Sequence, residues 1–145
     1  VTSAFRFDYG PRVRSGPGVA CQIAEVVAAE RILFVTDAGL RGLGLCDAPL
    51  AALAAAGRDV VVFDAVEEDP SVATVHAAVS AGDGTGAVVG LGGGSPMDVA
   101  KVAAYLLGSG DDIEAIYGVG NATGTSLPLV LVPTTAGTGS EATPI

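Results

Sequence analysis

The stretch Gly92-Gly93-Gly94-Ser95-Pro96-Met97-Asp98-Val99-Ala100-Lys101 decides the fold of this chain. An apolar run at 87–91 precedes it, and residues 99–107 carry apolar side chains at helical spacing. The order is therefore strand, glycine loop and helix. Three successive glycines let the backbone approach a bulky anion, because glycine has no Cβ and tolerates positive φ. A helix start adds free N–H groups and the positive end of its dipole, so the pattern is typical of a phosphate-binding turn.

The residues after the glycines indicate where the helix begins. Ser95 is a favoured N-cap residue, and Pro96 suits the first helical position because its missing N–H costs nothing there. Asp98 would then occupy the third helical position, where a side chain can bond back to the cap. We therefore expect the helix to begin directly after Ser95. The alternative interpretation of the loop is a tight turn without a ligand, for which three glycines in a row are unusual.

Strand and helix patterns alternate along the chain. The continuous apolar character of strands buried on both faces of a sheet is found at 32–35, 59–64, 87–91 and 128–132. Helical spacing is found at 19–27, 48–56 and 71–81, and a short helical patch at 111–117. This order predicts an α/β fold, with a Rossmann-like parallel sheet, flanking helices and right-handed crossovers. Aromatic residues alternating between 5 and 9 indicate one more short strand.

Polar residues follow two of the predicted strands. Asp37 comes soon after the run at 32–35, and a tract rich in hydroxyls and glycines, 133–143, follows the run at 128–132. The carboxyl ends of parallel strands form the edge at which ligands bind. Asp37 could accept hydrogen bonds from a ribose diol, and its charge would repel a 2′-phosphate, which predicts NAD rather than NADP. The alternative is that Asp37 only caps the next segment.

The arrangement differs from the common dinucleotide fingerprint. In that fingerprint the acidic residue follows the glycine loop by about 20 residues, whereas Asp37 precedes the loop here. Gly90-x-Gly92-x-x-Ser95 also lacks the third glycine or alanine. The site would therefore be a variant one. Because Lys101 is the only lysine, backbone N–H groups and a helix dipole would hold most of a bound phosphate.

Composition limits the classes of function open to the chain. Its 145 residues suffice for one domain, half of them are hydrophobic, and the net charge is −9. An acidic chain with seven basic residues is a poor candidate for nucleic-acid binding. No apolar run approaches transmembrane length, and no signal-peptide pattern is visible at the start. We expect a cytoplasmic protein that binds neither nucleic acid nor membrane.

Residues that commonly bind metals are few and scattered. His76 is the only histidine, and a metal site needs three or four convergent ligands. Cys21 and Cys46 lack the spacing of a metal or redox motif, so we expect both in the core. The acidic run at 67–69 indicates a solvated loop, although Asp69 faces the same sheet edge as the other candidates. No metal ligands are therefore assigned.

The two longest motifs resemble those of the iron-containing, or group III metal-dependent, alcohol dehydrogenase family. Residues 92–101 match the family's Gly-Gly-Gly-Ser-Pro-x-Asp-x-x-Lys, and residues 133–143 match its Pro-Thr-Thr-Ala-Gly-Thr-Gly-Ser-Glu-x-Thr. The resemblance implies the two-domain fold shared with dehydroquinate synthases. Residues 1–145 would form its N-terminal dinucleotide-binding domain, without the helical, metal-binding C-terminal domain.

The resemblance also implies a cofactor site. Its residues would be Asp37, Asp69, Gly92, Gly93, Gly94, Ser95, Asp98, Thr134, Thr135 and Thr138. The glycines and Ser95 would hold the pyrophosphate of NAD, Asp37 the adenosine ribose, and Asp98 would lie near the nicotinamide. The threonines would line the cleft. Asp69-Pro70-Ser71 replaces the family's usual Asn-Pro-Thr, and a carboxylate at that position cannot donate as the amide does.

The activity implied is hydride transfer between the nicotinamide and an alcohol or aldehyde. Iron or zinc would polarise the substrate oxygen, and its ligands would lie in the C-terminal domain, so we expect residues 1–145 alone to lack turnover. The full-length enzyme is expected to be a homo-oligomer. The alternatives are a non-catalytic NAD-binding domain and a related oxidoreductase, such as a glycerol dehydrogenase or maleylacetate reductase.

Overall fold

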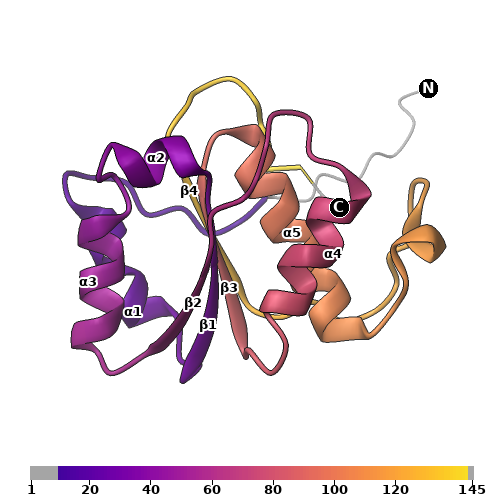
Figure 1. Ribbon diagram of the computed structural model, residues 1–145, viewed down its shortest axis with the longest axis horizontal. Coiled ribbons are helices and arrows are strands. Elements are labelled where there is room, and N and C mark those ends of the chain that lie inside the picture. The colour runs from indigo at the N-terminus through magenta and orange to yellow at the C-terminus, as the bar shows by residue number, and fades with distance from the viewer. Residues whose placement is uncertain (1–9, 144–145) are drawn as a thin grey trace, which may run out of the picture.

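The computed structural model describes residues 10–143, and within them four parallel strands form one sheet (Figure 1). In spatial order these are β2 (Asp59–Phe63), β1 (Arg31–Val35), β3 (Ala87–Gly92) and β4 (Leu129–Pro133). The parallel α/β fold predicted from the sequence is confirmed. The strand expected at residues 5–9 lies outside the described residues.

The two faces of the sheet are covered by different helices (Figure 1). Ile32 and Phe34 of β1 pack with residues from α1 (Ile23–Val26) and α3 (Asp47–Ala55). Leu33 and Val35 point the other way and pack with residues from α4 (Val72–Ala81) and α5 (Gly94–Ser109). All four β1 residues are fully buried, as expected for a central strand that is covered on both sides.

Helix α5 begins earlier than the sequence predicted. Gly93 is its N-cap residue, with an extended backbone and no side-chain cap, and the expectation that Ser95 caps the helix was wrong. The first helical hydrogen bond runs from the N–H of Met97 to the carbonyl of Gly93, at 3.4 Å. Pro96 therefore still lies in the first turn, where N–H groups have no helical partner, so its missing N–H costs no helical bond.

The segments at 19–27 and 37–42 also differ from expectation. A 3₁₀ turn, Val19–Gln22, and the single-turn α1 replace the continuous helix expected at 19–27. A short helix not predicted from the sequence, α2 (Ala38–Gly42), follows β1. The helical patch at 111–117 is a 3₁₀ turn, Ile113–Ile116. No helix in the described part of the chain is long and apolar enough to cross a membrane.

The cysteines lie in different surroundings. Cys46 is fully buried beside α3, as predicted. Cys21 is exposed, so its assignment to the core was wrong. The physical reason is the break in the first helical segment: Cys21 lies in the 3₁₀ turn, none of whose residues is buried.

Candidate functional site

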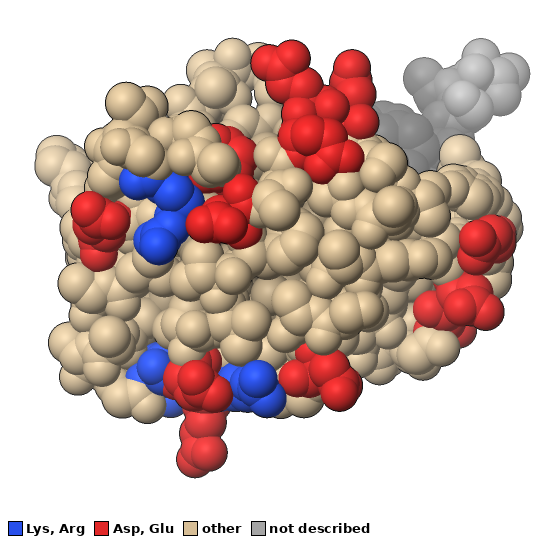
Figure 2. All heavy atoms as spheres, in the orientation of Figure 1, with Lys and Arg blue, Asp and Glu red and all other residues tan. Residues whose placement is uncertain are grey.

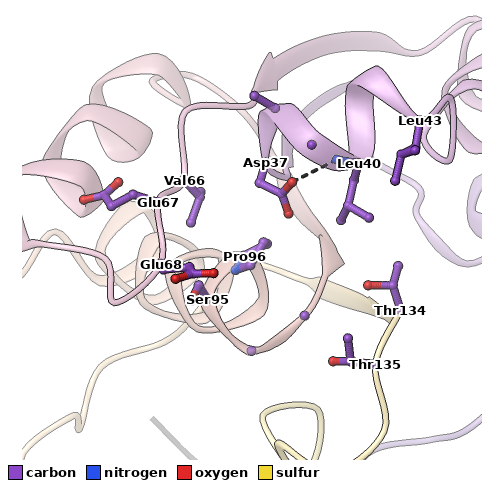
Figure 3. Close-up of a pocket in the computed structure, with 14 residues that line it drawn as sticks. Asp37, Leu40, Leu43, Val66, Glu67, Glu68, Ser95, Pro96, Thr134 and Thr135 are labelled. Carbon is purple, nitrogen blue, oxygen red and sulfur yellow. Dashed lines mark hydrogen bonds between the residues drawn. The ribbon is translucent and has the colours of Figure 1, made fainter.

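A cavity of about 520 Å³ lies where the strands end, within the size range of ligand pockets. Its wall combines the start of α2, the segment between β2 and α4, the start of α5 and the residues after β4 (Figure 3). Six of the ten predicted site residues line it: Asp37, Gly93, Gly94, Ser95, Thr134 and Thr135. The topology therefore gathers residues that lie up to 98 positions apart, from Asp37 to Thr135, around one hollow.

Close packing around two glycines positions the start of α5. A Cβ on Gly90 would lie 2.6 Å from the Cβ of Ala100, so glycine allows α5 to lie directly against β3. A Cβ on Gly92 would lie 2.6 Å from Cγ of Pro96. Both distances are shorter than real contacts. The absence of side chains at these two positions therefore fixes where the first turn of α5 meets the cavity.

The first turn of α5 lies at the cavity, and within residues 10–143 its backbone N–H groups have no side-chain cap. Gly93, Gly94 and Ser95 all line the hollow. The helix is 16 residues long, so its dipole places partial positive charge at this end. Among residues 10–143, no lysine or arginine lines the cavity. The expectation that backbone N–H groups, rather than basic side chains, would attract a bound anion stays a prediction.

The polar tract, residues 133–143, folds beside the glycine loop. The N–H of Thr134 donates to the carbonyl of Gly92 at 2.8 Å. A Cβ on Gly93 would lie 3.4 Å from Oγ1 of Thr135, and one on Gly94 would lie 3.2 Å from Cγ2 of Thr138. The tract thus brings neutral hydroxyl groups to the helix start. Thr138 contacts this region but does not line the cavity.

Asp37 caps a helix and faces the cavity. It is the N-cap of α2, and its Oδ1 accepts from the N–H of Leu40 at 2.9 Å (Figure 3). The capping role that the sequence left open as an alternative is therefore present. A carboxylate has about four acceptor sites, so one capping bond leaves capacity for a ribose diol. The two interpretations of Asp37 are compatible, and the ribose contact stays a prediction.

Eight lining residues were not predicted as site residues: Ala38, Gly39, Leu40, Leu43, Val66, Glu67, Glu68 and Pro96. Leu40 lies in the short helix α2, which sequence spacing did not reveal, and Leu43 directly follows that helix. The two glutamates come from the acidic run that was interpreted as solvated loop. Both are exposed, and yet both line the hollow. Their position soon after β2, at the same sheet edge as Asp37, is the signal that could have indicated them.

Glu67 is held by the start of α4. Its Oε1 accepts from the N–H of Ser71 at 3.1 Å and from the hydroxyl of Thr74. Ser71 is the N-cap of α4, and its hydroxyl accepts from the N–H of Thr74. The hydrogen bond from Thr74, followed by that from Ser71, lowers the pKa of Glu67 from 4.5 to about 2. Glu67 is therefore ionised at neutral pH.

Besides Thr138, three other predicted residues do not line the cavity. Asp69 is exposed and has a φ of 50°, in the left-handed region. Asp98 is exposed and pairs with Lys101 at 3.3 Å. Gly92 is buried beneath the loop. Their contacts with a cofactor stay predictions.

Most of the face shown in Figure 2 is uncharged, and among its charged side chains the acidic ones are more widespread than the basic ones. One group of acidic side chains stands at the upper edge, over the segment between β2 and α4 (compare Figure 1). Together with Asp37 and Glu68, Glu67 makes one side of the cavity negative. Within residues 10–143, no three His, Cys, Asp or Glu side chains are placed to hold a metal ion.

Comparisons with known proteins place these motifs in a family. The family model described as iron-containing alcohol dehydrogenase matches residues 10–145. Over 119 residues the chain is 36% identical to the NAD-dependent methanol dehydrogenase of Bacillus methanolicus. The matched region covers 81% of this chain and 31% of that protein. The chain spans about a third of the length of the curated relatives it matches.

Two solved structures extend the comparison. A 1,3-propanediol oxidoreductase matches 96% of this chain and 38% of its own, with a TM-score of 0.87 and 34% identity. A sulfoacetaldehyde reductase from Bifidobacterium kashiwanohense, solved in complex with NAD⁺, matches 97% of this chain and 39% of its own, with a TM-score of 0.80 and 34% identity. The fold of this chain therefore matches about two fifths of each of these two longer chains.

Proposed function

The chain belongs to the iron-containing alcohol dehydrogenase family, and from this premise we propose that residues 1–145 form the NAD-binding domain of a metal-dependent alcohol dehydrogenase. The observation that carries the proposal is the cavity at the carboxyl ends of the strands. It joins an uncapped helix start, a glycine loop and Asp37 in one hollow.

The residues of the cavity fit the parts of NAD. The pyrophosphate would bind the N–H groups of Gly94 and Ser95, at the positive end of α5. The adenosine ribose would donate to the carboxylate of Asp37. Thr134 and Thr135 would offer hydroxyls on the side of the cavity that the polar tract forms. A relative solved in complex with NAD⁺ supports this assignment.

The charge of the cavity favours NAD over NADP. Asp37, Glu67 and Glu68 all line it, and a 2′-phosphate on the adenosine ribose would face this negative side. In the described part of the chain, the lining holds no arginine or lysine that could neutralise such a phosphate. Repulsion between like charges would therefore weaken NADP binding.

In the complete enzyme we propose hydride transfer between the nicotinamide and an alcohol or aldehyde. An iron or zinc ion would act as a Lewis acid on the substrate oxygen. Its ligands would come from residues outside this chain, and the role of residues 1–145 would be to bind and orient the cofactor. A cytoplasmic location and a homo-oligomeric complete protein belong to the same proposal, supported by the family resemblance.

The direct test is a calorimetric titration of the chain with NAD and, separately, with NADP. We expect NAD to bind and NADP to bind at least tenfold more weakly. A circular dichroism spectrum of the same sample establishes that the chain is folded. A folded chain that binds neither dinucleotide would contradict the proposal, and tighter binding of NADP would contradict the role of Asp37.

A further inference from the structure

Lys101 is the only lysine of the chain, and its side chain is held inside the protein. It lies on α5, and only 9% of the side chain is exposed. Burial of an ammonium group is costly unless the group is paired and hydrogen-bonded. The contacts that compensate this burial therefore indicate what Lys101 does.

Three oxygens surround the ammonium of Lys101. Its Nζ donates to the hydroxyl of Thr143 at 2.8 Å and to the carbonyl of Thr143 at 3.3 Å. It also pairs with Oδ1 of Asp98, one turn earlier on α5, at 3.3 Å. Two of the three contacts thus join α5 to the far end of the polar tract, 42 residues along the chain. A lysine has three donors on one atom, and each faces an acceptor.

The polar tract has few other hydrogen bonds to the rest of the protein. At its start, the N–H of Thr134 donates to the carbonyl of Gly92. The N–H groups of Ala142 and Thr143 donate to Gly139, within the tract itself. Among the hydrogen bonds of residues 10–143, only the Thr134 bond and the Lys101 bonds tie the tract to the glycine loop and its helix.

We propose that Lys101 is a positioning residue that fixes the polar tract over the glycine loop. The tract is held at both ends, at Thr134 and at Thr143, and the segment between them carries the threonines that face Gly93 and Gly94. Lys101 itself does not line the cavity. This inference rests on the proposed binding of NAD, because its functional effect is the placement of Thr135 and Thr138 beside the pyrophosphate.

The test compares Lys101→Met with the unchanged chain, by hydrogen exchange and by NAD titration. Methionine retains most of the apolar stem but donates nothing to Thr143. We expect amide exchange in residues 135–143 to become at least tenfold faster, with exchange in β1 and β3 unchanged. NAD affinity should fall about tenfold.

Two further variants sharpen the test. Thr143→Val removes one of the two bonds to Lys101, and we expect about a threefold loss of NAD affinity that does not add to the loss in Lys101→Met. Arg31→Met removes the same charge at the opposite end of the sheet, where Arg31 pairs with Asp59 at the surface. It should leave NAD affinity within twofold.

The outcomes separate this inference from the proposed function. Unchanged exchange in residues 135–143 of Lys101→Met would overturn the inference, as would faster exchange throughout the sheet. If the tract loosens while NAD affinity stays within twofold, Lys101 is structural only and the inference fails. If the folded, unchanged chain does not bind NAD, the proposed function fails first. Should Lys101→Met not fold, Thr143→Val decides by the same two measurements.

Discussion

The two sides of the cavity differ in how they carry charge. The side built from the glycine loop and the polar tract offers backbone N–H groups and neutral hydroxyls, as at Gly94 and Thr134. The side built from α2 and the segment before α4 carries the carboxylates of Asp37, Glu67 and Glu68. The difference explains how a chain of net charge −9 could bind an anionic dinucleotide. In the proposed function, backbone dipoles would attract the anion, and side-chain charges would select among anions.

The largest effect is expected from a substitution at Gly92, in the glycine loop. This loop and the polar tract form the neutral side of the cavity. Gly92→Ala places a Cβ 2.6 Å from Cγ of Pro96, and the first turn of α5 must shift to relieve the clash. We expect the free energy of unfolding to fall by about 1–3 kcal/mol. NAD affinity should fall at least tenfold, because the phosphate donors move with the turn. Denaturant unfolding and calorimetry measure the two effects.

Gly42→Ala is the matched control for this substitution. Gly42 ends α2, and a Cβ there would meet nothing within 4 Å. Alanine should therefore leave NAD affinity unchanged and stability equal or slightly higher. Equal losses of NAD affinity in both variants would show that close packing at Gly92 has no special role.

Asp37 lies on the acidic side of the cavity, which it forms with Glu67 and Glu68. Substitutions of Asp37 can separate its role as a helix cap from its proposed role in selecting NAD. Asp37→Asn removes the charge and keeps an oxygen that can cap α2. We expect the preference for NAD over NADP to fall at least tenfold, or about 1.4 kcal/mol, with little change in stability. Asp37→Ala should show the same loss of preference and a further loss of about 1 kcal/mol in the free energy of unfolding.

Paired titrations with NAD and NADP, and thermal unfolding of each variant, make this comparison. An unchanged preference in Asp37→Asn would leave Asp37 as a helix cap alone. If Asp37→Asn is as unstable as Asp37→Ala, the cap depends on charge rather than on the accepting oxygen.

The two sides also differ in how well the sequence predicted them. The neutral side follows from local pattern, because Gly92 to Pro96 and the threonine tract each occupy one short stretch after a buried strand. Its geometry was predicted less well. The sequence could not show that Gly93, rather than Ser95, precedes the first turn, because the loop conformation there depends on packing of Pro96 against Gly92.

The acidic side depends on tertiary placement, which local pattern does not contain. Helix α2 has only five residues, two of them glycine, so no apolar period marks it. Leu40 and Leu43 could therefore not be assigned to the wall. Glu67 and Glu68 belong to an acidic run, and its composition does not distinguish a solvated loop from a cavity wall. The pairing of β1 with β2 places that run beside Asp37.

Ionic strength offers a way to sharpen the comparison without a substitution. Attraction by backbone N–H groups at close range is screened little by salt, whereas repulsion of a 2′-phosphate by exposed carboxylates is screened well. We expect NAD affinity to change less than about threefold between 0.05 and 0.5 M NaCl, while NADP affinity rises relative to it. Titrations at both salt concentrations measure the ratio. A steep fall of NAD affinity with salt would indicate that basic side chains, and not the backbone, hold the phosphates.

The smallest effect is expected at Glu67, through pH. Its folded-state pKa of about 2 lies below its ordinary value of 4.5, chiefly because of the hydrogen bond from Thr74. A depressed carboxyl pKa stabilises the folded state above the ordinary value, and this contribution is lost as pH falls from 4.5 to about 2. Glu67→Gln should therefore flatten the dependence of unfolding midpoint on pH in that window. Thr74→Val should raise the pKa of Glu67 toward 4.5.

Denaturant midpoints from pH 2 to 7, with NMR titration of the Glu67 carboxyl, measure both effects. Glu68→Gln is the matched control, because it removes the same charge one residue along without touching the bond from Thr74. If Glu67→Gln and Glu68→Gln flatten the curve equally, then general acidity of this side is responsible. If only Glu67→Gln does so, one carboxylate of the cavity wall fixes the start of α4. The acidic side then stabilises the fold in addition to its proposed role in selecting among anions.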